Sequence, residues 1–278
     1  MNFTKMHGAG NDFLLVEGNE ERDWTALSQA MCERHFGVGA DGVILVLPSS
    51  KAHVRMRLFN ADGSEAEVSG NGVRCLVRYA VERGLAAPQD GKVTIEAVHA
   101  VLEAGVEMDG TAVRRVRVSM GPPRFDPKEV PVAVEMSPPI IDLPLDVDGE
   151  RIAVTCLSMG NPHAVMFIDS PIDGYPLESI GPKVEHHPAF PARVNYGVGR
   201  LLDRGHMELR VWERGCGETL ACGSGSCAAM VAARLKGLAE DAVDITQPGG
   251  LLRVEWDGRG DVFLSGDARF VFDGVWPD

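Results

Sequence analysis

Short apolar runs at strand spacing dominate the chain, and few segments carry the longer period of a helix. The runs predict β-strands, for example at Val43–Leu47, Arg55–Phe59, Lys92–Glu96, Val113–Ser119, Met207–Trp212 and Leu252–Trp256. Helical spacing that ends at a glycine or an aromatic–glycine pair occurs at Trp24–His35, Val73–Arg83 and Ser226–Lys236. The pattern predicts a mixed α and β protein in which strands outnumber helices.

The two halves of the chain repeat each other. A single ungapped offset aligns Met6 with Met159, Arg57 with Arg210, Glu65 with Glu218, Gly70 with Gly223, Gly72 with Gly225, and Gly84-Leu85-Ala86 with Gly237-Leu238-Ala239. One offset that links a strand, a turn, a glycine loop and a helix end indicates a duplication. We therefore expect two similar lobes with a cleft between them, and the proline-rich stretch Gly121–Pro127 is the natural boundary.

Composition narrows the function classes. Of the 278 residues, 45% are hydrophobic and 24% charged, which is typical of a soluble globular protein. The net charge of −13 disfavours nucleic acid and anionic membranes as partners. No signal peptide or membrane-spanning run is evident, so the six cysteines are expected to be free thiols. The spacing of Cys216, Cys222 and Cys227 is not that of a zinc site.

The repeat centres on two glycine loops that precede helices, Ser69–Gly72 and Cys222–Gly225. Backbone N–H groups at a helix start attract negative charge, and this position lowers the pKa of a thiol. Inversion of a stereocentre needs a base on one face of the carbon and an acid on the other, which two such loops could supply. Either loop taken alone could equally be an ordinary capped turn. We expect Cys222 to be a base whose thiolate alkylates faster than the other thiols.

Motifs along most of the chain carry a resemblance to one enzyme family. In chain order they are Lys5–Phe13 (KMHGAGNDF), Phe59–Glu65 (FNADGSE), Gly70–Cys75 (GNGVRC), Met159–His163 (MGNPH), Arg193–Asn195 (RVN), Glu213–Thr219 (ERGCGET), Ala221–Gly225 (ACGSG) and Pro248–Gly250 (PGG). Together they are similar to diaminopimelate epimerases, isomerases of lysine and peptidoglycan precursor biosynthesis that interconvert LL- and meso-2,6-diaminopimelate.

The resemblance implies an α/β (α+β) fold of two pseudo-symmetric lobes, each a β-sandwich or barrel wrapped around a central helix, with the active site in the cleft. The lobes would span 1–121 and 122–266, and a C-terminal strand at about 267–278 would return to the first lobe. The resemblance also implies a cytoplasmic homodimer that uses neither pyridoxal phosphate nor a metal.

Site residues carry over position by position. Cys222 and Ser69 stand at the two catalytic positions. The expected substrate contacts are Asn11, Asn60, Gly70, Asn71, Asn161, Asn195, Glu213, Arg214, Gly223 and Ser224. Gly70-Asn71 and Gly223-Ser224 would cradle the carboxylate of the reacting centre, and Glu213 with Arg214 would bind the distal amino-acid head.

Ser69 departs from the family, which has a cysteine at both helix starts. A serine hydroxyl is a far weaker acid than a thiol, so it is a poor group for proton transfer near neutral pH. A natural serine variant, an engineered substitution and a relative with altered chemistry all fit this residue. Cys75 lies almost two turns into the helix and is expected to face packing.

Several of these residues also have structural interpretations. Asn60–Ser64 fits a hairpin turn with an Asp-Gly step, His163 fits a hydrogen-bonded loop histidine, and Glu213-Arg214 fits a solvated ion pair. Gly37–Gly42 matches G-x-G-x-x-G, but a helix precedes it and a strand follows, so a dinucleotide site is rejected.

Four functions remain open: the epimerase, a racemase of another amino acid, a binding protein impaired in catalysis by Ser69, and a lyase or isomerase that needs one base.

Overall fold

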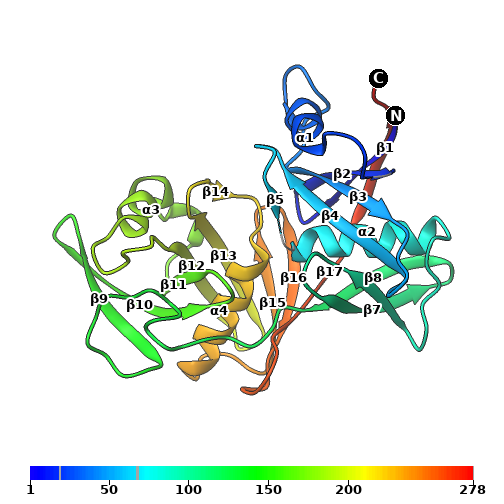
Figure 1. Ribbon diagram of the computed structural model, residues 1–278. Helices are drawn as coiled ribbons and strands as arrows, with labels where there is room; N and C mark the ends of the chain where they lie inside the picture. Colours follow the sequence, from blue (N-terminus) through cyan, green and yellow to red (C-terminus); the bar gives the residue numbers. More distant parts are fainter. Residues whose placement is uncertain (19, 67–68, 278) are drawn as a thin grey trace. The chain divides into compact units, whose positions relative to one another are not determined.

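The strands of this protein fall into two compact units, each with a helix at its centre. The computed structural model describes residues 1–18, 20–66 and 69–277, so Asp278, at the end of the expected C-terminal strand, lies outside it. The chain divides into one unit of Met1–Ser119 with Ser265–Asp278 and another of Met120–Leu264. Figure 1 shows the elements of both units, and each is described here by itself.

The first unit is built on two helices, α1 (Trp24–Cys32) and α2 (Gly70–Glu82). Its strands are β1 (Asn2–Gly8), β2 (Asn11–Glu17), β3 (Gly42–Leu47), β4 (Val54–Asn60), β5 (Glu65–Ala66), β6 (Lys92–Glu96), β7 (Val101–Asp109), β8 (Ala112–Ser119) and β18 (Arg269–Val275).

The second unit contains α3 (Leu177–Glu185), α4 (Gly223–Leu235) and the 3-10 turn η1 (Ile172–Gly174). Its strands are β9 (Ile140–Val147), β10 (Glu150–Ser158), β11 (Pro162–Phe167), β12 (Asn195–Asp203), β13 (His206–Glu213), β14 (Gly217–Thr219), β15 (Ala242–Gln247) and β16 (Gly250–Glu255). Strand β17 (Phe263–Gly266) spans the division.

Strand pairing follows the same order in both units. In the first, β1–β2 is antiparallel, β2–β3 parallel, β3–β4 antiparallel and β4–β6 parallel. In the second, β10–β11 is antiparallel, β11–β12 parallel, β12–β13 antiparallel and β13–β15 parallel. The last strand, β18, pairs antiparallel with β1 as β9 does with β10. The repeat in the sequence is thus a repeat of topology.

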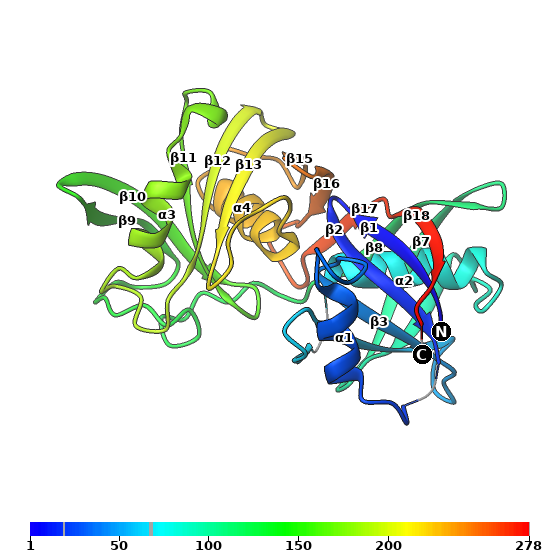
Figure 2. The ribbon, with the colours of Figure 1, turned by 90° about the horizontal axis from the view of Figure 1, so that it is seen from above.

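Each unit closes around its own central helix. Figure 2 shows α2 and α4 among strands: α2 packs on β1, β2, β3, β4 and β8, and α4 on β10, β11, β12, β13 and β16. Cys75, Leu76 and Val77 of α2 are fully buried, as are Cys227 to Ala233 of α4. The prediction that Cys75 faces packing is confirmed, and so is the mixed α and β fold class.

Helix boundaries differ from the sequence prediction for local reasons. Both central helices begin three residues earlier than expected, because the glycine loops form their first turns. Helix α1 ends at Cys32 instead of His35, since the Glu33 carboxylate accepts the backbone N–H groups of His35 and Phe36 and closes a turn. Helix α3, which contains Pro182, was not predicted.

Candidate active site

Ser69 is the N-cap residue of α2. Its backbone is extended, and Gly72 N–H donates to Ser69 Oγ over 3.2 Å. This contact satisfies one of the free N–H groups of the first turn, as small polar caps do. The hydroxyl is half-buried. The sequence placed Ser69 correctly at a helix start.

Cys222 has the equivalent position on α4. Its backbone is also extended, and Gly225 N–H donates to Cys222 Sγ over 3.3 Å. Ser224 Oγ lies 3.6 Å from the same sulfur. The thiol is therefore held by the N–H groups and the hydroxyl of its own helix start.

The expectation of a lowered thiol pKa at Cys222 is wrong for this structure. Cys222 is only 4% exposed, whereas Cys216 is the exposed cysteine. Burial, followed by the negative charge of Glu213, raises the pKa of the Cys222 thiol, and these effects outweigh the hydrogen bonds from Ser224 and Gly225. The thiol is protonated at neutral pH, so its use as a base requires a proton acceptor.

Glu213 is the carboxylate that meets this requirement. It ends β13, and Thr219 Oγ1 donates to Glu213 Oε1 over 2.6 Å. Its charge acts on Cys222. The family resemblance assigned Glu213 to the distal head of the substrate, which stays a prediction, and the structure adds an effect of its charge on the Cys222 thiol.

Asn195 binds the backbone of Arg214, which follows Glu213 in the hairpin between β13 and β14. Arg214 N–H donates to Asn195 Oδ1 over 2.9 Å, and Asn195 Nδ2 donates to the Pro162 carbonyl over 2.8 Å. The Arg214 guanidinium is exposed and donates to the Ala192 carbonyl over 3.1 Å. Asn195 is thus buried support for the hairpin, while the guanidinium is accessible to a ligand.

A polar chain connects α4 to β11. Asn161 Nδ2 donates to Ser224 Oγ over 3.3 Å, and His163 Nε2 lies 2.9 Å from Asn161 Oδ1. Burial, with a smaller effect of Arg214, lowers the pKa of His163 to about 3. His163 is therefore neutral at physiological pH and orients the Asn161 amide.

Gln247 holds the backbone of Cys222 and was missed by the sequence analysis. Cys222 N–H donates to Gln247 Oε1 over 3.0 Å, and Gln247 Nε2 donates to Ser226 Oγ over 2.7 Å. The hydroxyl of Ser226 in turn donates to the Cys222 carbonyl over 3.0 Å. The position of Gln247 directly before Pro248–Gly250 was the available signal.

In the first unit, asparagines gather at the start of α2. Asn71 Nδ2 donates to Asn11 Oδ1 over 3.2 Å, and Asn11 Nδ2 donates to Asp41 Oδ2 over 2.6 Å. Among the described residues, none donates to the buried Asn71 Oδ1. Asn60 lies in a turn in which its Nδ2 donates to Ser64 Oγ over 3.0 Å, so the hairpin interpretation describes its local structure. Asp41 is a second residue that the sequence analysis missed.

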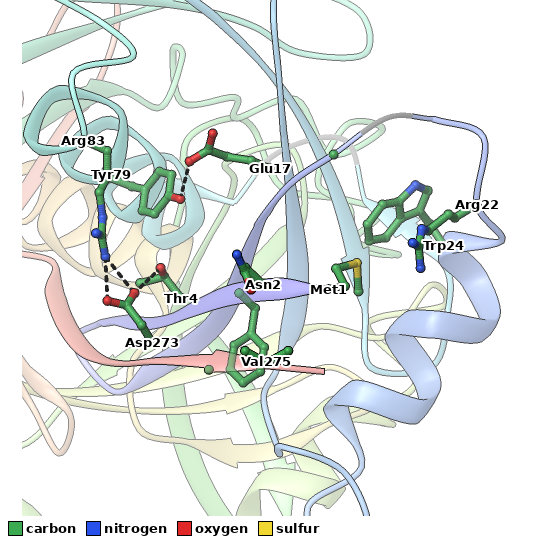
Figure 3. Close-up of a pocket in the computed structure, with 13 residues that line it drawn as sticks. Met1, Asn2, Thr4, Glu17, Arg22, Trp24, Tyr79, Arg83, Asp273 and Val275 are labelled. Carbon is green, nitrogen blue, oxygen red and sulfur yellow. Dashed lines mark hydrogen bonds and ion pairs between the residues drawn. The ribbon is translucent and has the colours of Figure 1, made fainter. Parts of the chain in front are cut away.

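A cavity of about 690 Å³ in the first unit involves none of the expected site residues (Figure 3). Two pairs of its polar side chains are hydrogen-bonded: Tyr79 Oη donates to Glu17 over 2.6 Å, and Arg83 donates to Asp273 over 2.7 Å. Within residues 1–18, 20–66 and 69–277, no cluster of three or more metal-ligating side chains occurs, and no helix is long and apolar enough to cross a membrane.

Comparisons with known proteins identify the family of this chain. The sequence pattern of the family described as diaminopimelate epimerase matches residues 3–125 and 155–271. The chain is 45% identical to the diaminopimelate epimerase of Moorella thermoacetica, covering 100% of this chain and 99% of that protein. It is 44% identical to that of Acetivibrio thermocellus, covering 99% and 98%.

Solved structures with little sequence identity share the fold. A Bacillus anthracis phenazine biosynthesis protein of the PhzF family superposes with a TM-score of 0.71 at 19% identity, covering 99% of this chain and 98% of that one. A hydroxyproline epimerase from Agrobacterium vitis also gives 0.71, at 16% identity and with 99% and 91% covered.

Proposed function

The chain belongs to the diaminopimelate epimerase family, and on this premise we propose the roles of its residues in interconverting LL- and meso-2,6-diaminopimelate. The enzyme is an isomerase of lysine biosynthesis. The single observation that carries the proposed mechanism is the buried Cys222 thiol at the start of α4, which accepts Gly225 N–H and whose pKa is raised by burial and by the negative charge of Glu213.

Cys222 is the proposed base for one isomer. Glu213 accepts the thiol proton when substrate enters, and the resulting thiolate removes the α-proton. The electron pair of the broken C–H bond moves onto the substrate carboxylate, whose added charge is stabilised by the N–H groups at the helix starts, including those of Gly223, Ser224, Gly70 and Asn71. No cofactor is assigned to any of these steps.

Ser69 is the proposed group for the opposite face of the carbanion. It hands over its hydroxyl proton, and the new C–H bond completes the inversion. The alkoxide left behind is costly to form, so proton donation by Ser69 limits this direction. Solvent water then reprotonates Ser69 and accepts the proton held by Glu213. In the reverse direction a neutral hydroxyl must serve as base, and it is a poor one.

The remaining proposed substrate contacts follow from the hydrogen-bonding groups that each side chain has free or exposed. Asn71 Oδ1, buried and without a donor among the described residues, suits the substrate ammonium. Asn11 orients Asn71, and Asn60 contributes its side-chain oxygen, since its Nδ2 already donates to Ser64. The exposed Arg214 guanidinium suits the distal carboxylate. In the same unit, Asn195 holds the Arg214 backbone and Asn161 holds the Ser224 hydroxyl, and both are proposed as further substrate contacts.

We also propose that the enzyme is a cytoplasmic homodimer. Strand β18 exposes Val271, Phe272 and Val275, and neighbouring exposed apolar side chains favour association with another chain. All six cysteines are free, which fits a reducing compartment.

Incubation with LL- and meso-diaminopimelate in D₂O tests the mechanism. We expect interconversion of both isomers, with α-proton exchange of the isomer that faces Cys222 exceeding net inversion. Turnover of a monoamino acid alone would indicate a racemase of another substrate. Binding without exchange would indicate an amino-acid-binding protein, and loss of the substituent next to the α-carbon would indicate a lyase.

A further inference from the structure

The carboxylate of Glu185 binds the hairpin that carries Glu213 and Arg214 at two points. Trp212 Nε1 donates to Glu185 Oε2 over 2.8 Å, and Gly215 N–H donates to Glu185 Oε1 over 3.0 Å. Trp212 directly precedes Glu213, and Gly215 directly follows Arg214. The two oxygens of Glu185 thus fix the residues on both sides of the Glu213-Arg214 pair.

Glu185 occupies a position that is unfavourable for a carboxylate. It is the last residue of α3 and only 4% exposed. The C-terminus of a helix is negative, and burial of an ionised carboxylate is costly unless hydrogen bonds satisfy it. The partial ion pair with Arg193, at 3.7 Å, adds one cation. Helix stability does not explain a glutamate here, whereas its two bonds to the hairpin do.

Packing supports the same interpretation. A Cβ on Gly181 of α3 would lie 2.6 Å from ring atoms of Trp212, so the helix backbone lies directly on the indole. The helix, the indole and the Glu185 carboxylate together form a rigid support for the start of the hairpin. A small displacement of this support would move Glu213 relative to Cys222.

We propose that Glu185 is a positioning residue that sets the distance between the Glu213 carboxylate and the Cys222 thiol. This inference rests on the proposed role of Glu213. Glu185 touches neither the substrate nor the thiol, and it acts through Trp212 and Gly215.

Glu185→Gln is the informative variant, because glutamine has the same shape but one acceptor oxygen. Both hairpin groups are donors, so the new amide NH₂ must face either Trp212 Nε1 or Gly215 N–H. We expect kcat to fall by about 10²-fold, the loss typical of a displacement near 1 Å, with a much smaller change in KM. Glu178→Gln, an exposed position in the first turn of the same helix, is the matched control and should leave both constants within about two-fold.

Two readouts do not depend on turnover. In Glu185→Gln, amide hydrogen exchange of residues 213–217 should accelerate. The pH midpoint for alkylation of Cys222, located by mass spectrometry, should fall as Glu213 moves away. Both readouts apply even if the protein fails to epimerise diaminopimelate, so failure of the proposed function is distinguishable from failure of this inference.

The double variant Trp212→Phe with Glu185→Gln sharpens the test. Phenylalanine removes one of the two donors, so the glutamine oxygen can accept Gly215 N–H without conflict, and kcat should recover about ten-fold over Glu185→Gln. The proposal is overturned if Glu185→Gln matches Glu178→Gln in kcat and Cys222 alkylation. It is also overturned if the buried Cys156 and Cys227 become reactive together with Cys222, since this would indicate general unfolding.

Discussion

The starts of α2 and α4 share one backbone conformation but differ in the chemistry of their N-cap side chains. Both N-cap residues are extended, and both accept the N–H of the residue three positions later. The supporting ion pair is repeated as well: Arg57 Nε lies 2.7 Å from Glu65, and Arg210 Nε lies 2.7 Å from Glu218. The duplication has kept the parts that hold each helix start.

The two units differ at the positions that handle protons. Under the repeat offset, Ser69 corresponds to Cys222, and Asn60 corresponds to Glu213. At these two positions the second unit has a thiol and a carboxylate, while the first has a hydroxyl and an amide. The comparison shows that the same scaffold can carry different acid–base groups. Of these four side chains, the two that ionise most readily, the Cys222 thiol and the Glu213 carboxylate, both belong to the second unit.

Cys222→Ser places a hydroxyl side chain at both helix starts and should have the largest effect on the reaction rates. General acid–base groups contribute roughly 10²–10⁴-fold, and we expect epimerisation and α-proton exchange of both isomers to fall by an amount in that range. Rates by NMR in D₂O provide the measurement. Cys227→Ser, one turn further along α4 and equally buried, is the control and should remain active. Equal losses in both variants would remove the special role of Cys222.

Ser69→Cys places a thiol side chain at both helix starts. We expect net inversion to rise by about 10²-fold, at the lower end of the general acid–base range, because a thiol can both donate and accept the proton near neutral pH. The exchange of the two isomers in D₂O should become more nearly equal. If Ser69→Cys changes neither rate, Ser69 is not the group on the second face of the carbanion.

Arg214→Ala gives the second unit the residue found at the equivalent position of the first, Ala61. A charge-assisted contact to the distal carboxylate contributes roughly 1.5–3 kcal/mol, so affinity for diaminopimelate should fall about 10- to 150-fold. Calorimetry with diaminopimelate and with a monoamino acid separates the two substrate ends. Equal losses for both ligands would contradict the assignment, and Arg200→Ala on β12 is the control.

His163→Gln tests the buried histidine, whose equivalent in the first unit is Gly10. The folded pKa of His163 is about 3 and the ordinary value is 6.5, so below pH 6.5 the unfolded chain binds a proton that the folded protein does not. Folding stability is lost as pH falls from 6.5 towards 3, by up to about 1.4 kcal/mol per pH unit. Glutamine removes this pH-dependent loss, so urea denaturation from pH 7 to pH 4 should show the stability of the natural chain falling relative to that of His163→Gln. Parallel curves would mean that the folded protein protonates His163 as readily as the unfolded chain does.

The sequence alone determined the features that local patterns encode. Glycines and a small cap residue specify a helix start within a few positions, so Ser69 and Cys222 could be placed correctly. The offset that aligns Arg57 with Arg210 and Gly72 with Gly225 revealed two units with the same order of strands. The family followed from motifs in fixed order.

Tertiary structure decided how those residues behave. The dipole of α4 predicted a lowered pKa for Cys222, but burial and the Glu213 carboxylate at the end of β13 raise it instead. Glu185, Gln247 and Asp41 had no motif of their own, because their function is to hold other residues through contacts between distant segments. A local pattern fixes the backbone of a few residues, whereas burial and charge at a site depend on elements that only the folded chain brings together.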